Sequence, residues 1–137
     1  MTKDRSLTTA IHILCSLAVL DQRRLTSNDL ALTLKTNSGL IRRVLSKLSS
    51  HGFISTIKGK NGGSMLSMPA DKINLKMIYQ AVNSGPLFNT FSKAPFQPCR
   101  VSCQIGGIME NVYGELEEHL LNDMARQTLA QIVGKIE

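Results

Sequence analysis

Residues 37–63 read NSGLIRRVLSKLSSHGFISTIKGKNGG, and this stretch decides the fold class. Up to Gly52, its apolar residues recur at steps of three and four, which is the spacing of one buried helix face, and a glycine commonly ends a helix. Residues 53–58 (FISTIK) then combine apolar and polar side chains and are rich in β-branched residues, which predicts a half-buried strand. The sequence therefore predicts a helix followed by a strand.

The turn after this strand and the segments before this helix complete the pattern. Asn61-Gly62 is the dipeptide most typical of a β-hairpin, and residues 64–68 would form the returning strand. Upstream, residues 6–20 and 27–35 both have helical apolar spacing. Three helices followed by a hairpin predict a winged helix-turn-helix.

The second half of the chain is predicted to be helical, with one irregular connection. Residues 73–82 have the spacing of a fourth amphipathic helix, and residues 85–98 hold three of the four prolines and form a connecting loop. One long helix starts at Cys103 or Gln104. Its apolar stripe comprises Ile105, Ile108, Val112, Leu116, Leu120 and Met124.

The long helix is predicted to need a partner. A helix of about 20 residues extends about 30 Å, which is longer than a small winged helix can cover with its own core. A second copy of the same helix is the economical partner, because most soluble oligomers are two-fold homodimers. The alternative is that the helix packs back across its own domain. Thr128 and Gln131 fit a capping box for a short final helix.

The predicted fold class is mainly α, with a small β-hairpin wing and a long C-terminal dimerisation helix. A winged helix-turn-helix DNA-binding domain would occupy residues 1–84, and a connecting loop with a candidate sensor thiol residues 85–102. A dimerisation helix and a short capping helix would occupy residues 103–137. The longest apolar run, residues 10–20, is too short for a membrane span, and no leader peptide precedes it. We therefore expect a soluble, cytoplasmic protein.

Positive charge is concentrated in the first half of the chain. Residues 1–68 hold ten Lys and Arg against three Asp, a net charge of +7. Residues 69–137 hold six basic against seven acidic residues, a net charge of −1. This asymmetry indicates that the first half contacts a polyanion, although a merely solvated basic face would also account for it.

The predicted third helix and the wing carry the residues suited to contact double-stranded DNA. Cationic groups hold phosphates, and short polar groups reach base edges in the grooves. Arg42 and Arg43 suit guanine or phosphate contacts, with Lys47 as a phosphate anchor. The predicted DNA-binding set is Asn37, Ser38, Arg42, Arg43, Lys47, Lys58 and Lys60.

The same residues resemble the Rrf2 family of bacterial winged-helix regulators. The opening stretch 37–63, in which KGKNGG takes the place of an Arg-Gly-x-x-Gly-Gly wing, carries the resemblance, together with AIHILCSLAVL, DKINLKMIYQAV and CQIG. The resemblance implies a homodimer with crossed long helices that binds a palindrome as a repressor or regulator. It also places Lys58 where members often carry an arginine, and Ser64 departs from the usual aromatic residue.

The resemblance raises the question of an iron-sulfur cluster, which several members hold through three closely spaced cysteines. This chain has only Cys99 and Cys103 in that region, whereas an all-cysteine cluster needs four thiolates. The histidines His12, His51 and His119 are scattered. We therefore expect no cofactor and no metal site.

Thiol sensing is the alternative prediction for Cys99 and Cys103, although these residues would equally be incidental thiols in a loop. If Cys103 begins the long helix, unpaired N–H groups and Arg100 would lie near its sulfur and favour the thiolate. Cys103 also falls where one branch of the resembling family has a Cys-Pro-Val-Gly segment. Cys15 lies beside the apolar stripe of the first helix and is predicted to be part of the core.

These observations predict a sequence-specific, DNA-binding transcriptional regulator. By resemblance it would be a homodimeric repressor on a palindromic operator, with a thiol-redox response as a further hypothesis. No arrangement of catalytic residues is recognisable, so an enzyme is not expected. The alternatives are a winged helix that docks on and sequesters a metabolic enzyme, and an iron-sulfur sensor.

Overall fold

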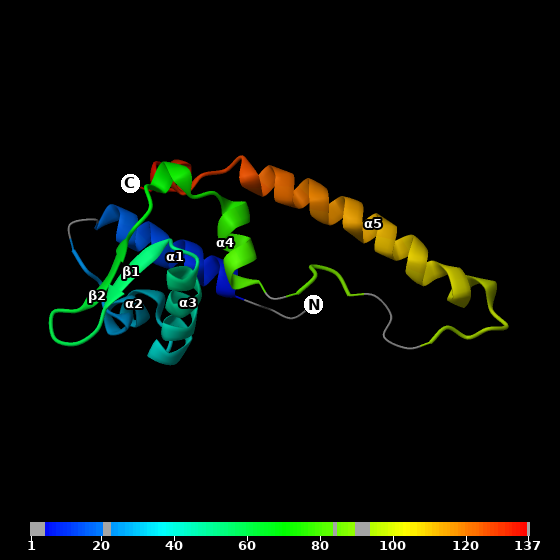
Figure 1. Ribbon diagram of the computed structural model, residues 1–137, viewed down its shortest axis with the longest axis horizontal. Helices are drawn as coiled ribbons and strands as arrows, with labels where there is room; N and C mark the ends of the chain where they lie inside the picture. Colours follow the sequence, from blue (N-terminus) through cyan, green and yellow to red (C-terminus); the bar gives the residue numbers. More distant parts are fainter. Residues whose placement is uncertain (1–4, 21–22, 84, 90–93, 137) are drawn as a thin grey trace.

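The N-terminal part of the chain forms three helices and a two-stranded hairpin (Figure 1). The computed structural model describes residues 5–20, 23–83, 85–89 and 94–136, so the predicted domain boundary at residue 84 lies outside the described residues. The elements are α1 (Ser6–Val19), α2 (Ser27–Leu34), α3 (Ser38–Ser50), β1 (Ile54–Ile57) and β2 (Gly63–Leu66). The predicted winged helix-turn-helix is confirmed.

Local hydrogen bonds fix the start of α2 and the turn between α2 and α3. The Thr26 hydroxyl accepts from the Asp29 N–H at 3.1 Å, and the Asp29 carboxylate accepts from the Thr26 N–H at 3.0 Å. Lys35 ends α2 in the left-handed conformation, with φ of 51°. The side chain of Asn37 then caps α3 by accepting from the Leu40 N–H at 2.8 Å. These caps satisfy N–H groups that have no partner within a helix.

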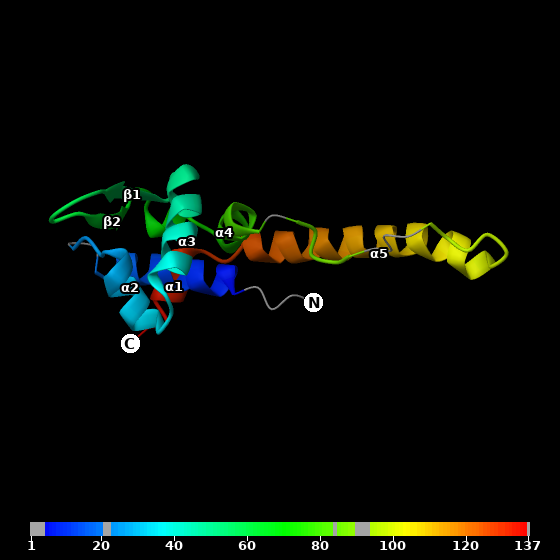
Figure 2. The same cartoon turned by 90° about the horizontal axis from the view of Figure 1, so that it is seen from below.

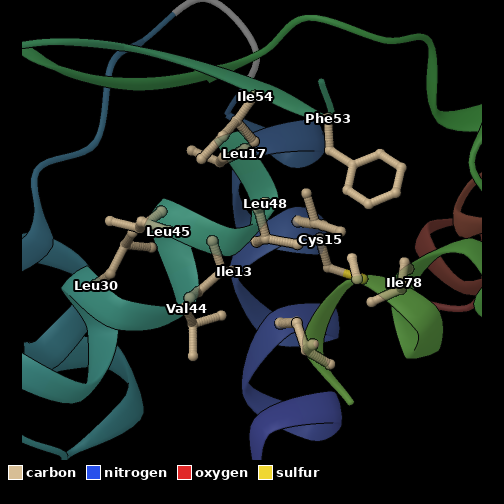
Figure 3. Packing of buried hydrophobic residues seen from close by; sticks show 14 of the residues in the cluster. Ile13, Cys15, Leu17, Leu30, Val44, Leu45, Leu48, Phe53, Ile54 and Ile78 are labelled. Carbon is tan, nitrogen blue, oxygen red and sulfur yellow. The ribbon is translucent and has the colours of Figure 1, made fainter. Parts of the chain in front are cut away.

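The hydrophobic core forms around α1 (Figure 3). Ile13 of α1, Leu48 of α3 and Ile78 of the next helix, α4 (Leu75–Val82), are fully buried, and Cys15 lies in the same cluster. The prediction that Cys15 is a core residue is therefore confirmed. The core holds the opposite, polar face of α3 outward, because the apolar residues of that helix all point inward.

The turn of the wing has the predicted length but is shifted by one residue. Its strands pair antiparallel from Ile54 with Leu66 to Ile57 with Gly63, so the turn comprises residues 58–62, where residues 59–63 were expected. The returning strand accordingly starts at Gly63 and ends at Leu66, where residues 64–68 were expected. Gly63 has φ of 134°, and a Cβ there would lie 2.9 Å from the carbonyl oxygen of Leu25.

The base of the wing is held by a buried hydroxyl pair. Ser64 is 1% exposed, and its hydroxyl is 3.0 Å from that of Thr56 on the opposite strand. Its backbone also pairs with Leu25, just before α2. A serine therefore packs at the position where the resembling family usually has an aromatic residue.

The C-terminal elements differ in part from the prediction. After the 3-10 turn η1 (Ala70–Lys72) come α4 (Leu75–Val82), α5 (Arg100–Ala125) and α6 (Leu129–Val133). The predicted start of the long helix at Cys103 or Gln104 is wrong, because Cys99 caps α5 by accepting from the Ser102 N–H at 3.4 Å. The 26 residues of α5 extend about 39 Å.

The final helix α6 packs against the winged-helix core. Leu129 is fully buried within the same cluster as the residues of α1. Its N–H donates to the Ile73 carbonyl at 2.8 Å, and the Leu75 N–H donates to the Gln127 carbonyl at 2.9 Å. The predicted capping box of Thr128 is confirmed. Thus α6 is anchored to the N-terminal unit, although the sequence grouped it with the long helix.

The long helix α5 projects away from the winged helix (Figures 1 and 2). Val101, Ile108, Val112, Leu116 and Leu120 are all exposed on it, and only its last turn, at Met124, is buried. The alternative that α5 packs back across its own domain is therefore wrong. Among the residues that the structure describes, no helix combines the length and hydrophobicity of a membrane span.

Candidate nucleic-acid interface

A cleft of about 710 Å³ lies between α3, the start of α2 and the wing. We call it the wing cleft. Its walls include Thr26, Ser27, Arg42, Ser46, Ser49, Thr56, Ile57 and Lys58. It thus combines two cationic side chains with a row of hydroxyl groups, which is the chemistry that binds phosphates and reaches base edges.

The α3 side of the wing cleft follows from helix geometry. Ser38, Arg42 and Ser46 are four residues apart and therefore share one face of the helix. The guanidinium of Arg42 donates to the Ser38 hydroxyl at 3.3 Å. This contact holds Arg42 along the face of α3 that it shares with Ser38, near the N-terminal end of the helix.

Arg43 and Lys47 occupy a different face of α3. They line a smaller hollow of about 280 Å³ together with Ser6, in the first turn of α1. The structure therefore divides the predicted cationic face in two. Arg42 lies in the wing cleft, and Arg43 lies outside it.

Four of the predicted DNA-binding residues make hydrogen bonds within the protein. The Asn37 side-chain oxygen is engaged in capping α3, so this oxygen positions the helix start. The ammonium group of Lys47 donates to the carbonyl oxygen of Val82 at 3.3 Å. The Ser38 hydroxyl accepts from Arg42, so these two side chains lie next to each other.

The wing presents its two lysines differently. Lys58 directly follows β1 and lines the wing cleft. Lys60 is exposed in the turn that the Gly62 N–H closes by donating to the Gly59 carbonyl at 3.0 Å. Gly59 has φ of 94°, a conformation that suits glycine. Lys60 is therefore placed at the wing tip.

Sequence reasoning missed several hydroxyl groups of the wing cleft, including three from segments before and after α3. Thr26, Ser27 and Thr56 line the cleft, yet their sequence patterns indicated only a helix cap and an ordinary strand. The spacing along the chain gives no signal that these segments meet. The short bridge between Leu25 and Ser64 brings them together.

The two candidate sensor thiols lie at the far end of α5. Cys99 is the N-cap residue, and Cys103 lies in the following turn, where its N–H donates to the Cys99 carbonyl at 3.1 Å. The Cys103 sulfur is 3.5 Å from the Gln97 carbonyl and 3.8 Å from that of Phe96. The condition under which unpaired N–H groups and Arg100 would favour its thiolate, that Cys103 begins the long helix, is therefore not met. Cys103 is nonetheless exposed.

The chain is similar to known transcriptional regulators. Residues 4–135 match the family model described as "Rrf2: Iron-dependent Transcriptional regulator". The HTH-type transcriptional regulator YwnA of Bacillus subtilis is 27% identical over 130 residues, which are 95% of this chain and 96% of that protein.

Solved structures share the fold. A transcriptional regulator from Lactobacillus plantarum has a TM-score of 0.83 at 22% identity, over 96% of this chain and 89% of that one. CymR, the global cysteine regulator of B. subtilis, has a TM-score of 0.67 at 14% identity, over 100% of this chain and 99% of that one.

The iron in the family description calls for a test of the donor set. In the described ranges, no three His, Cys, Asp or Glu side chains are grouped so as to hold a metal ion. Cys15 is enclosed in the core, so one copy of the chain offers only Cys99 and Cys103. Two thiols do not fit an all-cysteine cluster, which needs four.

Proposed function

The chain belongs to the Rrf2 family of transcriptional regulators, and from this premise we propose that it acts in the cytoplasm as a homodimeric repressor on a palindromic operator. It is a DNA-binding regulator and not an enzyme. The observation that carries the proposal is the wing cleft, where Arg42 and Lys58 lie among hydroxyl groups beside α3.

The apolar stripe of α5 supports the homodimer. Five large apolar side chains of α5 are exposed, from Val101 at 68% to Leu120 at 38%, and all of them except Val101 belong to this stripe. Exposed stripes of this length are typical of interfaces, and a two-fold axis would cover each stripe with the other. The pairing would also set two copies of α3 at a fixed separation. A palindromic operator is the DNA counterpart of that symmetry.

Selection of bound fragments from random DNA tests this proposal. We expect a palindrome whose half-sites are about one helical turn apart. Its affinity should fall steeply with salt as phosphate counterions are released. A protein-docking winged helix would select no sequence, and its apolar contacts would not weaken with salt.

We also propose that Cys99 and Cys103 respond to oxidants such as hydrogen peroxide. Two thiols would lose two protons and two electrons to form a disulfide, and the peroxide would be reduced to two waters. The test compares operator binding by reduced protein, oxidised protein and Cys103→Ser. Equal binding in all three states would contradict a redox role.

We further propose that regulation proceeds without an iron-sulfur cluster. The donor set of one chain supports this, because only two accessible thiols lie near each other. Protein purified anaerobically should be colourless and free of iron. Visible absorbance with bound iron would instead favour a cluster shared between two copies.

A further inference from the structure

Lys47 caps a helix other than its own. Its ammonium donates to the carbonyl oxygen of Val82 at 3.3 Å, and Val82 is the last residue of α4. The last carbonyls of a helix lack partners within it and carry partial negative charge. A lysine ammonium donates a hydrogen bond to such a carbonyl and carries the opposite charge. Val82 is only 3% exposed, so little water competes for this carbonyl.

The place of α4 gives this contact its importance. Helix α4 packs against α1 and α3 and also against α5, and it lies between them in Figure 1. Directly after Val82, the side-chain amide of Asn83 donates to the Tyr79 hydroxyl at 2.9 Å and to the Gly85 carbonyl at 2.6 Å. The end of α4 is thus tied both to α3 and to the start of the linker that leads to α5.

The position of Lys47 along α3 agrees with a role away from the bases. Recognition helices contact bases mainly through their N-terminal residues. Lys47 lies nine residues after Ser38, which is about 14 Å along the helix axis. It does not line the wing cleft, whereas Arg42 does.

We propose that Lys47 is a positioning residue that holds α3 against the C-terminal end of α4 and so couples the recognition helix to the linker and α5. Its main role is then this contact and not phosphate binding. The inference rests on the proposed function, because it concerns how the same DNA interface is set. The ammonium has two further protons, so the experiment must separate positioning from phosphate contact.

The test measures two affinities of the full-length protein, for the selected palindromic duplex and for a scrambled duplex of equal length, at several salt concentrations. The variants are Lys47→Met, which keeps the aliphatic stem, and Lys47→Arg, which keeps a charged donor. Arg43→Met is the matched control from the same face of α3. The ratio of the two affinities is unaffected by the fraction of folded protein.

For Lys47→Met we expect operator affinity to fall about tenfold with little change for the scrambled duplex. The salt slope should stay that of the wild type, and Lys47→Arg should restore the ratio. For Arg43→Met both affinities should fall, and the slope should decrease by about 0.9.

Two results would overturn the inference. One is a Lys47→Met variant that behaves like Arg43→Met, since that pattern identifies a phosphate contact. The other is a Lys47→Met variant with the wild-type ratio. If the wild-type protein itself binds the palindromic and the scrambled duplex with nearly equal affinity, the proposed function is wrong, and this inference fails with it.

Discussion

Arg42 on α3 and Lys58 after β1 line the same cleft, whereas Arg43, the neighbour of Arg42 in the chain, lines a separate hollow. We therefore expect the two charges of the wing cleft to contact one segment of a bound polyanion, and Arg43 to contact another. This separation leads to different expectations for the two arginines.

Arg42→Ala should reduce sequence discrimination, and Arg43→Ala should not. Loss of a side chain that contacts a base costs about 1–3 kcal/mol for the preferred site. Loss of a phosphate contact weakens all DNA sequences alike and lowers the salt slope. Operator and scrambled-duplex titrations measure both effects. Equal loss of discrimination in the two variants would contradict the division of the cationic face.

Gly63→Ala should destabilise the protein through the wing. Gly63 has φ of 134°, and a Cβ would meet the Leu25 carbonyl oxygen at 2.9 Å. Backbone strain of this kind costs about 1–3 kcal/mol. Gly114→Ala is the control, because a Cβ there meets nothing within 4 Å and alanine favours the helix. Chemical denaturation should show a lower free energy of unfolding for Gly63→Ala and no decrease for Gly114→Ala.

Leu116→Glu should convert the proposed dimer to a monomer. Leu116 is 49% exposed in the middle of the apolar stripe of α5, and a buried unpaired carboxylate is strongly unfavourable in an interface. Sedimentation measures the change in mass. Glu118→Gln, on another face of α5, should leave the mass unchanged. A Leu116→Glu variant that still sediments as a dimer would exclude the stripe as the interface.

Alkylation should distinguish the buried thiol of Cys15 from the exposed thiol of Cys103 in the folded protein. Burial raises the pKa of the Cys15 thiol, and the side chain is enclosed in the core. Since the thiolate is the reactive form, Cys15 should resist iodoacetamide, whereas exposed Cys103 should react. Mass spectrometry of short reactions locates the adducts. Rapid modification of Cys15 without denaturant would mean that α1 is not packed as described.

Stability should decrease at acid pH in part through Asp29. Hydrogen bonds from the backbone and then the hydroxyl of Thr26 lower the pKa of the Asp29 carboxyl. A carboxyl with a lowered pKa stabilises the fold above its unfolded value, near 4, and this contribution is lost as the pH falls through the folded value.

The variant Asp29→Asn should remove this part of the pH dependence. The free energy of unfolding, measured by urea denaturation between about pH 2 and pH 6, should depend on pH more weakly than in the wild type. The difference should be small, because solvent screens a largely hydrated carboxyl. A pH dependence identical to that of the wild type would show that the cap persists when Asp29 is protonated.

Local signals predicted much of the DNA-binding unit. The Thr26 cap and the apolar steps of α3 each involve neighbours in the chain, so their outcome can be worked out from spacing. In β1, by contrast, only Ile54 is buried, so the burial expected for a half-buried strand is wrong there. The start of α5 was missed, because no such local signal marks it. Its cap is Cys99, and thiols are not among the side chains by which helix starts are recognised.

The sequence by itself determined the winged helix, the cationic character of α3 and the apolar stripe of α5, because periodicity and charge are properties of consecutive residues. The tertiary structure decided which cations share a cleft, that Lys47 contacts the end of α4, and that Leu129 returns to the core. These outcomes depend on backbone carbonyls and buried surfaces brought together from distant segments. Every residue has the same backbone carbonyl group, so no pattern of side chains in the sequence shows which carbonyl a lysine will contact.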